Sequence, residues 1–209
     1  MLADKRILLI IGGGIAAYKA LDLIRRLRER GALVRAVMTA AAQEFVTPLS
    51  VGALTADHVF TDLFDRQDEQ DVGHIRLARE ADVIVVAPAT ADLMAKAAQG
   101  LAGDLAGAVL LATGVPVLMA PAMNPAMWAH AATRRNHARL LADGVRVVLA
   151  RGPEVDPDRR HLERVADAHL LGHRLERLVR GGHGRVGHHP EHPLRLVELR
   201  TKPSLFGHV

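Results

Sequence analysis

The sequence contains no cysteine and very few aromatic residues, and both absences limit what the protein can be. Without cysteine, disulfides, thiolate metal ligands and a thiol nucleophile are excluded, and the composition fits a reducing compartment. Phe, Trp and Tyr make up 3% of the chain, whereas hydrophobic residues of all kinds make up 49%. The core must therefore consist mainly of Ala, Val, Leu and Ile, which suits helices packed closely on a sheet.

Long hydrophobic runs and a recognisable targeting segment are also lacking. No run approaches the roughly 20 apolar residues that a membrane-spanning helix needs, and residues 1–6 are too few for a signal peptide. We therefore expect a cytoplasmic protein with no membrane partner. The net charge is +4, but most of its excess lies in residues 151–209, and no basic stripe interleaved with aromatics precedes them. We expect no nucleic-acid partner.

Runs of Ile, Val and Leu alternate with stretches of helical periodicity. We expect strands at 6–12, 33–38, 83–87, 116–120 and 145–149, and a short one at 59–61. We expect helices at 16–30, 75–80, 93–98 and 127–143. Because the strands are continuously apolar, both of their faces should be buried, which predicts an α/β fold with a doubly wound parallel sheet in three layers, α/β/α.

The chain length and a change in composition predict the domain organisation. With 209 residues, the chain is long enough for one well-packed domain and an appendage. Residues 1–150 form the expected ligand-binding domain. Residues 151–209 are rich in Arg and His and have little periodicity apart from 162–178, so we expect an atypical, poorly ordered C-terminal segment.

The first candidate ligand contact is the glycine run after the first strand. Gly12, Gly13 and Gly14, followed by Ala17, satisfy the pattern G-x-G-x-x-G/A and open a helix whose N-terminus attracts anions. The ligand is a dinucleotide, a mononucleotide or none, since a tight turn without ligand has the same pattern. The second strand ends without the acid that NAD binding requires, and Thr39 offers a hydroxyl suited to a terminal phosphate. This favours a mononucleotide such as FMN.

Two further strand ends carry polar side chains among small residues. After the strand at 83–87, Thr90 and Asp92 either approach a flat ring or cap the next helix, and both readings remain open. After the strand at 116–120, Asn124 either binds a carboxylate or caps a helix. Met127 and Trp128 either line a pocket there or simply pack.

His74 begins a helical segment after an acidic loop. A single histidine is more often structural or solvent-exposed, but an imidazole in this position also suits a general base. The residues alone leave both possibilities open. No cluster of ligands suggests a metal.

These residues together resemble a known family, the homo-oligomeric FMN-containing cysteine decarboxylases. The resemblance covers about residues 4–150, and it rests on GIAAYK (14–19), MT (38–39), FVTPL (45–49), HI (74–75), APATA (87–91) and PAMNPAMW (121–128). It is strongest toward members that decarboxylate 4′-phosphopantothenoylcysteine to 4′-phosphopantetheine in coenzyme A biosynthesis.

The resemblance implies a flavodoxin-like fold, an FMN cofactor and a homotrimer or a larger trimer-based oligomer. It implies an FMN-dependent carboxy-lyase in which His74 is the base and Asn124 and Met127 bind a thiol carboxylate substrate. The cofactor-binding residues implied by the resemblance or by the strand-end pattern are Gly12, Gly13, Gly14, Ile15, Thr39, Phe45, Thr90, Ala91, Asp92 and Met123.

The sequence departs from the family pattern in three places. The family has a flap cysteine that donates a proton in the last step, and the alignment puts Pro157 there. Asp92 and Gly103 stand where the family usually has Asn and Asp, and the charge of Asp92 is expected to weaken the flavin contact. The missing cysteine leaves two alternatives: oxidative decarboxylation of a peptide C-terminal cysteine to an aminoenethiol, or a flavin-binding subunit without complete turnover.

Overall fold

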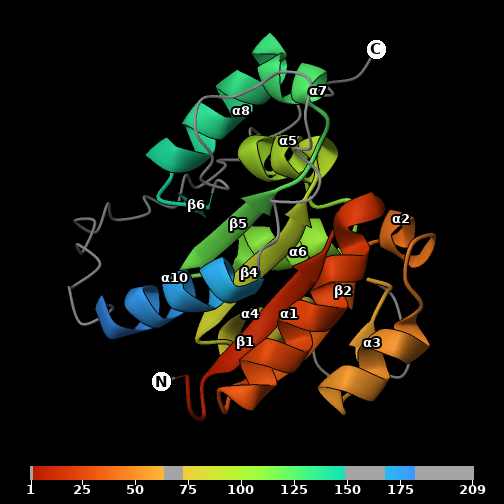
Figure 1. Ribbon diagram of the computed structural model, residues 1–209. Helices are drawn as coiled ribbons and strands as arrows, with labels where there is room; N and C mark the ends of the chain where they lie inside the picture. The colour runs from red at the N-terminus through yellow and green to blue at the C-terminus, as the bar shows by residue number, and fades with distance from the viewer. Residues whose placement is uncertain (1, 64–72, 149–167, 182–209) are drawn as a thin grey trace, which may run out of the picture.

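The computed structural model describes residues 2–63, 73–148 and 168–181, and a six-stranded parallel sheet lies at its centre (Figure 1). The strand order is β3-β2-β1-β4-β5-β6. The strands are β1 (Arg6–Ile11), β2 (Leu33–Met38), β3 (Val59–Phe60), β4 (Val83–Ala89), β5 (Val117–Pro121) and β6 (Arg146–Val147). Without the two-residue β3, the remaining strands follow the flavodoxin order, second, first, third, fourth, fifth. The predicted flavodoxin-like α/β class is confirmed.

Helices cover both faces of the sheet (Figure 1). One face carries α1 (Tyr18–Glu29), α3 (Pro48–Thr55) and α10 (Ala168–Gly181), and the other carries α4 (Gly73–Glu80), α5 (Ala91–Gln99), α6 (Leu105–Ala112) and α8 (Ala131–Ala142). Three short pieces lie beyond the ends of strands: the 3-10 turn η1 (Ile15–Ala17), α2 (Ala40–Gln43) and α7 (Pro125–Ala129). The layers are therefore helix, sheet, helix, as predicted.

The central strand β1 shows how the sequence builds these layers. Ile7, Leu9 and Ile11 enter the core with α1, whereas Leu8 and Ile10 enter the core on the opposite face. Successive side chains of a strand point to opposite faces, so a strand buried on both sides has to be apolar throughout. The continuous apolar run of β1, from which a buried parallel strand was predicted, arises because both faces of the strand are covered.

The predicted elements differ from the structure in identifiable ways. The expected single helix at 127–143 is wrong: α7 and α8 are separated at His130, whose backbone is extended (φ −58°, ψ 136°) and whose Nδ1 accepts a hydrogen bond from Ala132 N. Helices α3 and α6 were not predicted. The last strand is shorter than expected within the described residues, which end there at Val148, so Leu149 lies outside them.

Helix α10 lies beyond the expected domain boundary at residue 150. Leu171 and Leu175 are fully buried in the same core as α1, and the side chain of Arg30, the C-cap of α1, passes over Gly172. The helix overlaps the periodic stretch 162–178 and continues past it to Gly181. The boundary itself stays a prediction. No helix among the described residues is long and apolar enough to cross a membrane.

Candidate functional site

The first strand end is a glycine turn, which we call the glycine corner (Gly12, Gly13, Gly14 and Ile15). It lies at the carboxyl edge of the sheet, where the strands end. Gly12 N donates to Pro88 O over 3.2 Å, and a Cβ on Gly12 would lie 2.4 Å from that oxygen. A Cβ on Gly13 would lie 2.2 Å from Ala41 Cβ. Glycine is therefore required at both positions by protein atoms alone.

Gly14 differs from the two glycines before it. The nearest atom to a Cβ built there is Thr90 Cγ2 at 3.8 Å, so this side of the turn is open. Ile15 and Ala16 start η1, and the first N–H groups of a helix have no partner within it. Ile15 is also 57% exposed despite its apolar side chain. Free N–H donors beside an exposed apolar surface fit a ligand that has both a phosphate and an aromatic ring.

Thr39 connects the glycine corner to α2. Its Oγ1 accepts from Ala42 N at 3.2 Å and donates to Ile11 O at 3.3 Å. The hydroxyl that we predicted as a phosphate contact is thus the N-cap of α2. Phe45, which follows α2, is 47% exposed.

The corner after β4 lies directly beside the glycine corner, since Thr90 Cγ2 is 3.4 Å from the Cβ position of Gly12. Thr90 Oγ1 caps α5 by accepting from Leu93 N at 3.2 Å. Ala91 and Asp92 form the first turn of α5. The two readings of Thr90 at the sequence level, cap and ligand contact, are compatible because the cap leaves its methyl group toward the glycines.

Asp92 is paired, which the sequence analysis did not anticipate. Its side chain is 73% exposed, and Oδ2 lies 3.0 Å from Lys96 Nζ, one turn along α5. Lys96 Nζ also lies 3.0 Å from Asp104 Oδ2 at the start of α6. Hydrogen bonds to Asp92 and then Asp104 raise the pKa of Lys96, so it stays protonated at neutral pH. The i,i+4 spacing of Asp92 and Lys96 was a readable signal of this pair.

The corner after β5 joins the corner after β4 through a backbone hydrogen bond, Ala122 N to Ala89 O, of 3.0 Å. Asn124 Oδ1 accepts from Met127 N at 2.7 Å and so caps α7. Asn124 is exposed, and Met127 is 45% exposed. Met123, by contrast, is buried in the core. The amide oxygen of Asn124 is therefore occupied, and its Nδ2 has no hydrogen bond within the described residues.

Trp128 packs against α8. Its ring centroid lies 5.2 Å from that of His137, and the Arg134 guanidinium lies 5.5 Å from the Trp128 centroid. Burial, and then the charge of Arg134, lower the pKa of His137. Of the two predicted pocket residues, Met127 is thus exposed while Trp128 is largely engaged in holding α7 to α8.

His74 is the second residue of α4 and is half-buried. A crossover helix in a parallel sheet begins at the carboxyl edge, so His74 lies at the same edge as the three corners. It makes no side-chain hydrogen bond to another described residue. Pro157, the position aligned with the flap cysteine, lies outside the described residues.

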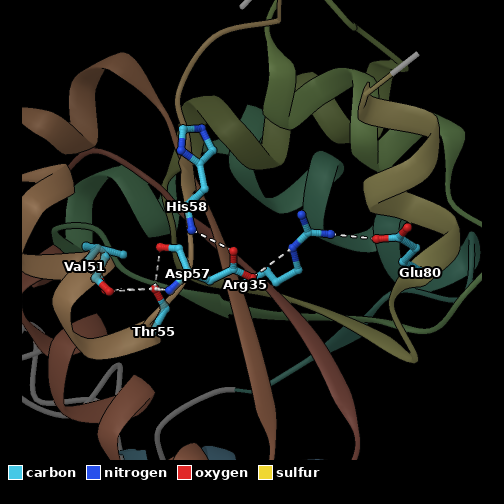
Figure 2. A network of polar contacts seen from close by, with 7 residues as sticks. Arg35, Val51, Thr55, Asp57, His58 and Glu80 are labelled. Atoms are coloured by element: carbon cyan, nitrogen blue, oxygen red, sulfur yellow. Dashed lines mark hydrogen bonds and ion pairs between the residues drawn. The ribbon is translucent and has the colours of Figure 1, made fainter. Parts of the chain in front are cut away.

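Helix α4 is held by its other end, at the amino edge of the sheet. Arg35 on β2 places Nη1 2.7 Å from Glu80 Oε2 and Nε 3.3 Å from Asp57 Oδ2 (Figure 2). Asp57 Oδ1 in turn accepts from His58 N at 2.7 Å. One arginine thereby fixes the end of α4 to the turn after α3.

A cavity of about 340 Å³ lies beside this network, at the edge opposite the predicted site. The two further arginines that line it also have partners: Arg6 pairs with Asp82 at 3.5 Å, and Arg28 donates to Leu54 O at 2.5 Å. Its cations are thus satisfied by the protein. None of the predicted cofactor-binding, substrate-binding or catalytic residues lines this cavity.

The structure therefore brings together the predicted residues of three strand ends, with His74 at the same edge. Within residues 2–63, 73–148 and 168–181, no group of three or more His, Asp or Glu side chains is placed to hold a metal ion. The sequence analysis did not identify Lys96 and Asp104, the residues linked to Asp92, and the contact between these two depends on how α5 and α6 pack.

Comparison with known sequences gives a consistent picture. The model of the Flavoprotein family matches residues 1–168. The coenzyme A biosynthesis bifunctional protein CoaBC of Vibrio vulnificus (strain YJ016) is 51% identical over 146 residues, which cover 70% of this chain and 36% of the relative. The chain thus spans about a third of the length of the curated relatives that it matches.

Solved structures of FMN-dependent and PPC decarboxylases are also similar to this chain. The FMN-dependent cysteine decarboxylase SpaF is 34% identical with a TM-score of 0.66, covering 81% of this chain and 99% of that one. A cysteine-to-serine mutant of a PPC (phosphopantothenoylcysteine) decarboxylase, complexed with pantothenoylaminoethenethiol, is 28% identical with a TM-score of 0.65, covering 81% and 99%. These similarities confirm the predicted family and support FMN as its cofactor.

Gly13 is tightly packed and Gly14 has free space beside it, so alanine substitutions at the two positions should differ in their effect on stability. Gly13→Ala should lower the free energy of unfolding of the FMN-free protein by about 1–3 kcal/mol, since its Cβ meets the backbone of Ala41. Gly14→Ala should change it by less than about 0.5 kcal/mol. Urea denaturation measures both. Equal losses would contradict the assignment of Gly14 to the open side.

Proposed function

Because the chain belongs to the Flavoprotein family, we propose that it binds FMN and decarboxylates 4′-phosphopantothenoylcysteine to 4′-phosphopantetheine, as an FMN-dependent carboxy-lyase of coenzyme A biosynthesis. The observation that carries the proposal is the meeting of three strand-end corners at the point where the strand order reverses, between β1 and β4. Ligands of doubly wound sheets bind at that point. The CoaBC relatives supply the reaction.

The residues at this edge fit FMN. The N–H groups at the start of η1, α2 and α5 bind the phosphate or approach the ring, helped by the partial positive charge of helix N-termini. Gly14 leaves room for close approach. The exposed side chains of Ile15 and Phe45 would contact the flat face of the flavin ring. The buried Met123 backs this surface from within the core.

Asn124 and His74 act on the substrate. With Oδ1 engaged by Met127 N, Asn124 is held in one orientation and has Nδ2 left to donate to the substrate carboxylate. The exposed Met127 provides an apolar contact beside it. His74 accepts the thiol proton, a role that an imidazole can take as a general base.

The chemistry is an oxidation that makes decarboxylation possible. Bound FMN supplies the acceptor for a hydride from the thiol-bearing carbon. Loss of that hydride and of the thiol proton to His74 forms a C=S bond β to the carboxylate. Carbon dioxide would then leave, and the electrons of the broken C–C bond would pass onto sulfur to give an enethiolate, which takes up a proton to become the enethiol. Full turnover to the thiol product would further require a proton and the two electrons taken up in the oxidation.

A second function is favoured by two observations. The sequence has no cysteine, so no thiol of its own can donate the last proton, and SpaF, a cysteine decarboxylase, is similar over 99% of its length. Under this reading the enethiol is released, and the substrate is a peptide with a C-terminal cysteine.

The oligomer that we propose is a trimer or a trimer-based assembly. Large apolar side chains exposed on this single chain support an interface: Leu49 is 83% exposed, Leu101 is 56% exposed and Leu111 is 62% exposed. Such residues commonly mark surfaces that a partner covers. Each partner would be another copy of the same chain.

Product analysis tests the proposal. Purified protein incubated with 4′-phosphopantothenoylcysteine should release carbon dioxide and give 4′-phosphopantetheine, identified by mass. A product lighter by two hydrogen atoms would instead show that the enethiol is released.

His74→Asn should retain FMN but should no longer permit flavin bleaching by substrate, because the thiol keeps its proton.

The matched control is His58→Asn, an exposed histidine at the opposite edge of the sheet, which should behave as the wild type. Catalysis would be refuted if the protein released no carbon dioxide and showed no flavin bleaching with either substrate, the thiol carboxylate or a peptide ending in cysteine. Normal bleaching in His74→Asn would remove His74 from the mechanism.

Asn124→Asp separates capping from substrate binding. Aspartate is as good an N-cap as asparagine, so α7 and the folding stability should be preserved. The new carboxylate would repel the substrate carboxylate and replace an N–H donor, so KM should rise by at least about tenfold, corresponding to about 1.4 kcal/mol. Steady-state kinetics measure this, and an unchanged KM would contradict the role of Asn124.

A further inference from the structure

Asp92 introduces a negative charge at the corner where an anionic cofactor is expected. It lies in the first turn of α5, whose N-cap Thr90 lies beside Gly12 and Gly14. A phosphate monoester carries roughly −1.5 to −2 charges at pH 7, so a nearby carboxylate opposes its binding. The side chain of Asp92 is 73% exposed, so its charge is not buried by the rest of the chain.

Lys96 is placed to offset that charge. Its Nζ lies 3.0 Å from Asp92 Oδ2 and 3.0 Å from Asp104 Oδ2. Asp104 is itself fixed, because its Oδ1 caps α6 by accepting from Gly107 N at 2.7 Å. The ammonium group is thus held from the α6 side and cannot move away from Asp92 without losing a second partner.

The two acids paired with Lys96 belong to different helix starts. Asp104 is the N-cap of α6, whereas Asp92 lies in the first turn of α5, whose N-cap Thr90 lies beside the glycine corner. The charge that Lys96 offsets at the glycine corner is therefore that of Asp92. The side chain of Lys96 is 36% exposed and that of Asp92 is 73% exposed, so added salt should weaken their attraction.

We propose that Lys96 is a positioning residue for the proposed FMN site at the corner after β4. Lys96 is held by Asp104, and it orients and neutralises Asp92. A carboxylate is then tolerated beside an anionic cofactor. This rests on the proposed binding of FMN. It makes Asp92, Lys96 and Asp104 one functional unit, and Lys96 has an effect only through Asp92.

A double-mutant cycle tests this on the full chain reconstituted with FMN. Lys96→Met should weaken FMN binding about three- to tenfold at low ionic strength, measured by quenching of flavin fluorescence, and should make the flavin midpoint potential more negative. In the Asp92→Asn background, Lys96→Met should change FMN affinity by less than about twofold. At about 0.5 M salt the effect should shrink.

The matched control is Arg25→Met, because Arg25 likewise bridges two acids, Asp22 at 3.0 Å and Glu29 at 3.1 Å, but on the outer face of α1. It should leave FMN affinity and potential unchanged. Equal weakening by Lys96→Met with and without Asp92 would mean a purely structural link between α5 and α6 and would overturn the inference, as would no weakening at all. Failure of the wild-type protein to bind FMN would overturn the proposed function as well.

Discussion

The close approach of β1 and β4 at the carboxyl edge is the constraint on which the site depends. Gly12 N donates to Pro88 O, and any side chain on Gly12 would collide with that oxygen. This contact places the glycine corner beside Thr90, and the pairing of β4 with β5 then brings the Asn124 corner alongside. Because β1 and β4 flank the reversal of strand order, the helices that follow them diverge to opposite faces and leave the edge between them accessible.

Helix N-termini supply most of the polar chemistry at this edge. Thr39, Thr90 and Asn124 each cap a helix, so their side chains fix the direction of the N–H groups that remain free. A capping role and a ligand role are compatible here, since a cap uses one oxygen and leaves the rest of the side chain available. The helix ends favour an anion, Asp92 opposes one, and Lys96 restores the balance. At the far edge, Arg35 holds Glu80 and thereby the helix that begins near His74.

The sequence predicted the sheet better than the helices, for physical reasons. Strands buried on both faces are continuously apolar, and β1 and β2 were placed almost to the residue. Helix α6, Leu105–Ala112, is apolar all round and has no periodic polar face, so only its cap at Asp104 signalled it. Helix α3 had a readable start, Thr47 before Pro48, that was overlooked. The family motifs located the strand-end residues, but the partnership of Lys96 with Asp104 depends on how α5 and α6 pack and has no signature in sequence spacing.

The measurement that tests the central claim most directly is the FMN content of the purified protein. After isolation or reconstitution with FMN and removal of excess, flavin is released by denaturation and quantified against protein. The account predicts equimolar FMN and a flavin visible spectrum in the folded protein. A colourless protein that takes up no added FMN would contradict it, because the carboxyl edge would then lack the ligand to which all its corners are directed.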